Sequence, residues 1–176
     1  MYLAHNTNPL YSSLSTRPSS LLHSMSIHAH SFLTAGTTND TFLRENLEYL
    51  KKASNWAQFS ATASFGVVHC GHVGEAMTLL EPYLPAEGTV IPPTSGFAEG
   101  GALYALGLIH AKSTLSTDSR TTSTTYLREQ LRNSMANEML SHGAALGIGL
   151  SAMGTKDASI FNELKVSEQR TNERNG

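Results

Sequence analysis

The chain has 176 residues, about the length of one domain, and a single cysteine, Cys70, so it has no internal disulfide framework. Its formal net charge is −2 and its basic residues are not clustered, which gives no electrostatic reason to expect nucleic acid or an anionic membrane as a partner. No apolar run reaches the roughly 18 to 20 residues that a membrane-spanning helix needs.

Apolar residues recur at helical spacing along most of the chain, with polar or glycine-containing turns between the periodic segments. Asn39-Asp40 and Asn55 are expected to cap two of the helices, and Gly36 and Gly71 to end two others. The predicted helices cover, in chain order, residues 20–35, 41–50, 56–69, 73–80, 97–111, 126–132, 138–153 and 155–164. The sequence therefore predicts an all-α fold.

Four segments lack this pattern. Residues 1–20 are polar and turn-rich, and residues 83–96 are rich in proline and glycine, so both are predicted to be irregular. Between 113 and 125, ten of thirteen residues are serine or threonine, which predicts a surface loop with no side chains to bury. Residues 166–176 carry no apolar pattern and are expected to form a disordered tail.

The chain also repeats itself at nearly constant spacing. Gly66, Gly107 and Gly149 are 41 and 42 residues apart, and each stands between two bulky apolar residues. An alanine lies five positions before each glycine, and another small residue lies one position further back. The nine repeated small-residue positions are Ser60, Ala61, Gly66, Gly101, Ala102, Gly107, Gly143, Ala144 and Gly149. A period of this size is typical of a repeat array.

Glycine inside a helix costs about 0.5–1 kcal/mol relative to alanine, so its repeated use implies a compensating gain. We expect that gain to be close backbone approach between neighbouring helices. The pattern then predicts an inner layer of tightly packed helices and an outer layer of ordinary amphipathic helices. These positions are structural, and none of them is expected to be catalytic.

These residues resemble the proteasome/cyclosome repeat family, which includes the two largest non-ATPase base subunits of the proteasome regulatory particle and the largest subunit of the anaphase-promoting complex. The segments that carry the resemblance are residues 36–40, 42–47, 53–56, 99–111 and 143–155. The resemblance covers residues 22–164 and is most specific at 99–111. It implies a segment of an α-α superhelix or toroid, with about three helix-pair repeats within residues 21–165.

The resemblance also implies a function. It indicates a non-catalytic scaffold in the base of the regulatory particle, acting in ubiquitin-dependent protein degradation in the cytoplasm and nucleus. Its partners would be other regulatory-particle subunits, namely the ATPase ring, the lid and the ubiquitin receptors. The alternatives are the sister base subunit, which receives ubiquitin and shuttle factors, and a stand-alone helical-repeat adaptor. The family continues through many more repeats, so we expect this chain to be a fragment or an incomplete gene model.

Some patterns could instead carry chemistry. The segment 147–152 fits the dinucleotide fingerprint G-x-G-x-x-G/A, but it lies in a predicted helix with no preceding strand. The segment 69–72, His-Cys-Gly-His, offers three metal ligands without a second cluster. Glu138 and His142 could form an acid–base pair, and Cys70 could be a nucleophile, although no Asn or Asp is evident to orient a neighbouring histidine. Helix packing and surface hydrogen bonds are the simpler interpretations, so we expect no catalytic residue, metal or cofactor.

Overall fold

The computed structural model describes residues 20–46, 53–86, 91–92, 94–111, 117–134 and 136–175, and the regular structure within these ranges is entirely helical. The predicted all-α fold is confirmed. The helices are α2 (Ser20–Leu33), α3 (Thr41–Glu45), α5 (Trp56–Val68), α6 (Ala76–Leu80), α7 (Phe97–His110), α8 (Thr117–Asn133), α9 (Glu138–Ser151) and α10 (Ala158–Asn175), with 3-10 turns at Val73–Glu75 and Glu81–Tyr83. Among the described helices, none combines the length and apolarity that crossing a bilayer requires.

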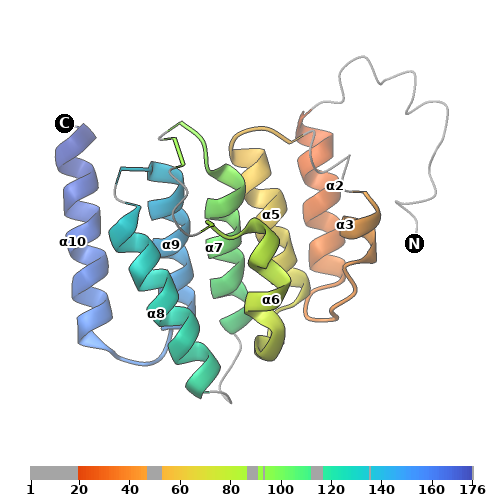
Figure 1. The fold of residues 1–176 in the computed structure, drawn as a ribbon. Helices are drawn as coiled ribbons and strands as arrows, with labels where there is room; N and C mark the ends of the chain where they lie inside the picture. The colour runs from red at the N-terminus through yellow and green to blue at the C-terminus, as the bar shows by residue number, and fades with distance from the viewer. Residues whose placement is uncertain are drawn as a thin grey trace.

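Four helices stand side by side in one row, in the order α2, α5, α7, α9 (Figure 1). The shorter α6 and the long α8 lie in front of this row and pack against α7, and α8 also packs against α9. The last helix, α10, stands beyond α8 and α9 at the end opposite α2. The row therefore forms the expected tightly packed layer, and α6 and α8 belong to a second layer that covers one of its faces.

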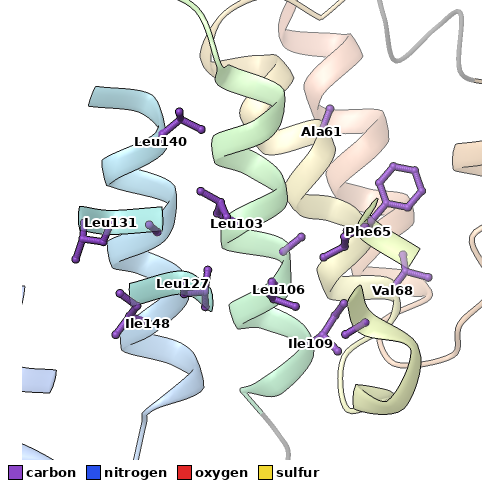
Figure 2. Packing of buried hydrophobic residues seen from close by; sticks show 14 of the residues in the cluster. Ala61, Phe65, Val68, Leu103, Leu106, Ile109, Leu127, Leu131, Leu140 and Ile148 are labelled. Atoms are coloured by element: carbon purple, nitrogen blue, oxygen red, sulfur yellow. The ribbon is translucent and has the colours of Figure 1, made fainter. Parts of the chain in front are cut away.

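The core lies between the two layers and is centred on α7 (Figure 2). Leu103, Leu106 and Ile109 of α7 have no exposed surface and fill the space between its two neighbours in the row. The surrounding buried side chains are Ala61, Phe65 and Val68 of α5, Leu140 and Ile148 of α9, and Leu127 and Leu131 of α8. Burial of aliphatic side chains on both flanks of α7 makes it the centre of the described fold.

The Ser/Thr-rich segment is not the predicted loop over its whole length. Helix α8 begins at Thr117, nine residues before the predicted start of the helix, and only residues 112–116 lie outside the described residues. Ser123, Leu127 and Leu131 are spaced four residues apart and are all buried, so the small Ser123 extends the buried stripe of the helix toward its start. Tertiary packing therefore overrides the weak helix propensity of serine and threonine in this segment.

The predicted tail is also wrong from 166 to 175, because α10 runs to Asn175. The helix begins just after Asp157, whose carboxylate accepts a 2.8 Å hydrogen bond from the backbone N–H of Ser159. Ile160 is buried near this start. A helix that is fixed at its beginning continues at little cost through residues such as glutamate, glutamine and arginine, even without an apolar pattern.

Two of the predicted caps occupy the cap position without acting as caps. Asp40 precedes α3 and Asn55 precedes α5, but neither side chain accepts a hydrogen bond from a backbone N–H of its own helix. Asn55 instead has a positive φ of 52°, a conformation that asparagine tolerates better than most residues. The start of α9 does carry a side-chain cap, since Asn137 Oδ1 accepts from the N–H groups of Met139 (3.0 Å) and Leu140 (3.1 Å).

The remaining helix boundaries differ only locally from those predicted. The predicted helix 73–80 is a 3-10 turn followed by the short α6. The predicted helix 41–50 is described only as α3 and Asn46, because residues 47–52 lie outside the described ranges. The irregular segment predicted for 1–20 also lies outside them, except for Ser20, which begins α2.

Candidate functional site

The most distinctive feature of the row is the contact between α7 and α9, where glycine faces backbone. A Cβ atom added to Gly107 would lie only 2.8 Å from the carbonyl carbon of Gly147. A Cβ atom added to Gly143 would lie 2.8 Å from the Cα of Gly100. Real Cβ atoms essentially never come this close to other heavy atoms. The two helices therefore meet backbone to backbone at two levels.

The contact between α5 and α7 repeats this arrangement one step earlier. A Cβ at Gly66 would lie 2.6 Å from the Cα of Ala105, and a Cβ at Gly101 would lie 3.0 Å from the carbonyl carbon of Phe59. In both contacts the earlier helix contributes a glycine near its C-terminal end, and the following helix contributes another small residue opposite it. We call these two contacts the glycine seams.

The structure places the nine predicted positions in three different environments. Gly66, Gly101, Gly107 and Gly143 lie in the glycine seams. The alanines Ala61, Ala102 and Ala144 are buried, and Ser60 is half-buried. Gly149 is the exception, because it is exposed and a Cβ there would have no neighbour within 4 Å. The expectation of close packing at Gly149 is therefore corrected.

Gly100 and Gly147 are seam residues that the sequence reasoning did not select. A Cβ at Gly147 would lie 2.6 Å from the carbonyl oxygen of Leu103, and one at Gly100 would lie 3.0 Å from the carbonyl carbon of Met139. A signal for Gly147 was present in the repeat, since Ser64, Ala105 and Gly147 are all small and all lie two positions before the marker glycine. Gly100 has no small counterpart in the other repeats, so nothing in the pattern marked it.

Gly149 is exposed because it lies on the side of α9 that faces away from α7. Gly149 lies 42 residues after Gly107, and His142 and Ala145 lie 42 residues after Gly100 and Leu103. Helix α9 therefore repeats the residue pattern through which α7 contacts α9. We define the open stripe of α9 as Ala145, Leu146, Gly149 and Met153, which are exposed or half-buried. A Cβ atom added to Gly149 would have no neighbour within 4 Å, because Gly149 lines a groove rather than a helix contact.

Grooves flank α10, which packs on the core through Ile160 and Leu164 and pairs with α8 through Glu163. A groove of about 440 Å³ separates it from the end of α9 and is lined by Gly149, Ala152, Ile160, Phe161 and Leu164 among others. A second groove, of about 520 Å³, lies between α10 and α8. Across the α8 side, Glu163 accepts hydrogen bonds from the Nε atoms of Arg128 (2.6 Å) and Arg132 (2.8 Å).

The histidines of the segment 69–72 take part in a network that joins the start of α3 to the end of α5. The Oδ2 atom of Asp40 accepts from Arg44 Nε at 2.7 Å and lies 3.0 Å from His69 Nε2, while His72 Nε2 lies 3.1 Å from the carbonyl oxygen of Gly36. No sequence pattern placed a carboxylate beside His69, and in the structure Asp40 takes that position. Within the described ranges, no three histidine, cysteine, aspartate or glutamate side chains are grouped so that they could hold a metal ion.

The other candidate chemical patterns also lie in packing environments. The segment 147–151 is helical, so it does not form the strand-to-helix turn that a dinucleotide fingerprint requires. The ring of His142 lies edge-on to Trp56, with centroids 5.4 Å apart, and 5.9 Å from the ring of Phe59. His142 thus belongs to an aromatic cluster that links α5 and α9.

Comparisons with known proteins agree with this architecture. Residues 60–91 match the proteasome/cyclosome repeat family. The chain is 49% identical over 146 residues to 26S proteasome non-ATPase regulatory subunit 1 homolog A of Arabidopsis thaliana, an alignment that covers 83% of this chain and 14% of the relative. It is 44% identical over 148 residues to 26S proteasome non-ATPase regulatory subunit 1 of Drosophila melanogaster, covering 84% of this chain and 14% of the relative.

A third relative extends the match. The chain is 41% identical over 171 residues to 26S proteasome regulatory subunit rpn2 of Schizosaccharomyces pombe, covering 94% of this chain and 17% of that protein. The chain thus spans about one seventh of the length of the first relatives that it matches. With its repeated glycine seams and this degree of identity, the chain belongs to the proteasome/cyclosome repeat family and is a homologue of 26S proteasome non-ATPase regulatory subunit 1.

Proposed function

We propose that this chain contributes a stiff helical-repeat segment to a non-catalytic scaffold in the base of the proteasome regulatory particle, acting in ubiquitin-dependent protein degradation. The observation that carries the proposal is that the alignments with regulatory-subunit relatives cover more than four fifths of the chain. The residues that distinguish the row, Gly66, Gly107, Gly143 and Gly147, serve backbone packing. A scaffold needs such fixed spacing between its elements, and close-packed backbones supply it.

Residues 21–165 form the repeat region in this proposal, and the repeated small positions other than Gly149 are its structural residues. The partners follow from the names of the relatives, which are regulatory subunits of the 26S proteasome. We infer that the chain associates with other subunits of the regulatory particle, including the ATPase ring, the lid and the ubiquitin receptors, in the cytoplasm and nucleus. The proposal assigns the chain no nucleic-acid or membrane partner and no cofactor.

The proposal that the chain is not an enzyme draws on two observations. The relatives are named non-ATPase regulatory subunits. Among the described residues, the histidine–carboxylate pair beside the cysteine is His69 with Asp40, which shares its carboxylate with Arg44 and fastens α3 to the end of α5. An arginine on the same oxygen satisfies the carboxylate structurally and leaves it less available to orient a catalytic base.

The two alternative functions are less well supported. The relatives that match are subunit 1 and its Rpn2 counterparts, which favours this base subunit over its sister. A stand-alone adaptor built from few repeats needs polar faces at both ends of the array. The open stripe of α9 is instead apolar, with Leu146 and Met153 exposed beside Gly149.

Affinity purification from cells tests the proposal. The chain is produced with an N-terminal tag at native level, and the proteins that purify with it are identified by mass spectrometry. We expect subunits of the regulatory particle to be recovered with the chain, and to be lost with Gly107→Leu, which breaks a glycine seam. Recovery of a folded chain free of proteasome subunits would overturn the scaffold function and leave the repeat fold intact.

A further inference from the structure

Helices α8 and α10 enclose a groove in which positive charge is in excess. Arg128 and Arg132 of α8 and Glu163 of α10 line this groove, whose volume is about 520 Å³. Both arginines donate from Nε to the carboxylate of Glu163, at 2.6 Å and 2.8 Å. The lining therefore holds two guanidinium groups against one carboxylate. The groove has both the charge and the room to take one more anionic group.

The additional guanidinium donor is directed at the hydroxyl group of Ser159. Arg128 Nη2 donates to Ser159 Oγ at 3.1 Å, while Arg128 Nε donates to Glu163. The side chain of Arg128 is only 28% exposed and makes both bonds, so it is held in place beside the hydroxyl. Ser159 also lines the groove. A phosphoryl group on Oγ would place strong acceptor oxygens, with about two negative charges, beside a donor that now meets a neutral oxygen.

Ser159 is accessible to an enzyme from outside the molecule. Residues 153–159 are all exposed, and Ser159 lies in the first turn of α10. Its backbone N–H donates to Asp157 Oδ1 at 2.8 Å, so opening this turn is enough to present the serine in an extended segment. Asp157 faces this backbone N–H, whereas Ser159 Oγ faces Arg128. The hydroxyl is therefore both reachable and directed at a cation rather than at a carboxylate.

We propose that Ser159 is a phosphorylation site and that the phosphorylated side chain fastens α10 to α8 through Arg128. The phosphoryl donor is ATP, used by a serine kinase. Ser159 Oγ forms a bond to the γ-phosphorus of ATP, the bond between that phosphorus and the bridging oxygen breaks, ADP leaves, and the hydroxyl proton passes to the catalytic base of the kinase. Arg128 then binds phosphate oxygens in place of a neutral hydroxyl, and Arg132 retains Glu163. The proposal is independent of the proposed proteasome function.

Mass spectrometry tests whether the modification occurs. The tagged chain is purified from the cells that make it, with phosphatase inhibitors present, and digested with trypsin. Cleavage after Lys156 and Lys165 releases residues 157–165, in which Ser159 carries the only hydroxyl group. We expect this fragment in two forms that differ by the mass of one phosphoryl group, and we expect phosphatase treatment to remove the heavier form. Absence of the heavier form from both growing and stressed cells would overturn the proposal.

Hydrogen exchange tests whether Arg128 holds the phosphate. Phosphoserine is incorporated at position 159 of the full 176-residue chain during translation, and exchange in α10 is compared with that of the unmodified chain. We expect exchange to be several-fold slower in the phosphorylated chain, and most of this slowing to be absent when both forms carry Arg128→Gln. Phosphoserine at Ser54, an exposed position ahead of α5, is the matched control and should leave α10 unchanged. The proposal is overturned by unchanged or faster exchange in α10 of the phosphorylated chain, or by the same slowing with Arg128→Gln.

Discussion

The contact between α7 and α9 differs in kind from the attachment of α10. On one side, α7 and α9 meet through Gly107, Gly143 and Gly147, with no side chain between the backbones. On the other side, α10 is tied to α8 through Glu163, with open grooves along its length. The first contact depends on the size of the residues in it, because a single methyl group would collide with main-chain atoms. The second depends on charges that are partly exposed to solvent and are therefore weakened by salt.

The glycine seams therefore determine how the helices are arranged, whereas substitutions in the ion pairs of α10 should be tolerated. Close backbone packing leaves one spacing between neighbouring helices, so the seams define the row. Ion pairs between long, partly exposed side chains tolerate small displacements and contribute little net stability. We therefore expect substitutions in the seams to affect the whole fold, and substitutions at Glu163 to affect α10 alone.

The largest effect is expected for Gly107→Leu. The added side chain collides with the backbone of Gly147, which no rotamer change can relieve, so the loss in unfolding free energy should reach roughly 3 kcal/mol or more. Thermal or urea unfolding, followed by circular dichroism, measures the loss. Lys165→Leu, at an exposed position of α10, is the surface control and should change stability by less than about 0.5 kcal/mol. Equal losses of unfolding free energy in the two variants would contradict the claim that the glycine seams stabilise the fold.

A smaller effect is expected for Asn137→Ala. Asn137 caps α9 through Met139 and Leu140, and its Nδ2 donates to the carbonyl oxygens of Pro92 and Ser95, both at 2.9 Å. Loss of the cap costs about 0.5–2 kcal/mol, and the released carbonyl groups add to that cost. Hydrogen exchange should show faster exchange in the first turn of α9, and Asn162→Ala, at an exposed position of α10, should leave that turn unchanged. Unaltered exchange at Met139 and Leu140 would contradict the capping role.

The effect of Glu163→Gln should be smaller still and confined to α10. The substitution removes the charge that pairs with Arg128 and Arg132, and at partly exposed positions this is expected to cost under about 1 kcal/mol. Hydrogen exchange in α10 should speed up at low salt, and the salt dependence seen in the unmodified chain should disappear. Glu168→Gln, an exposed position on the same helix, is the control. Faster exchange that extends into α7 would mean that α10 supports the row, contrary to the comparison.

The sequence predicted the row well because local signals and the tertiary structure agree there. Helices α5, α7 and α9 end within two residues of the predicted ends, since their apolar periodicity stops at turn residues such as Gly71 and Gly154. The first half of α8 was missed because its burial depends on Ser123, whose small polar side chain gives no apolar signal. The pairing of Asp40 with His69 joins residues 29 positions apart, and no periodic pattern reports such a contact.

Gly149 shows a different limit of sequence reasoning. A repeat pattern treats its copies alike, so Gly66, Gly107 and Gly149 were assigned one role. The structure distinguishes them by how closely the next helix approaches: the backbones of Ala105 and Gly147 contact Gly66 and Gly107, whereas an open groove separates Gly149 from α10. The same residue in the same register is therefore a packing residue in two repeats and part of an open surface in the third.

This contrast provides the most direct test of the central claim, that backbone contact at glycine holds the row together. The measurement is the unfolding free energy of Gly107→Ala and of Gly149→Ala, two single-methyl additions to helices at equivalent repeat positions. We predict opposite signs. Gly149→Ala should stabilise the chain by about 0.5–1 kcal/mol, because the new methyl meets open space and alanine favours the helix. Gly107→Ala should destabilise it, because the methyl meets the backbone of Gly147. Stabilisation by both substitutions would contradict the claim.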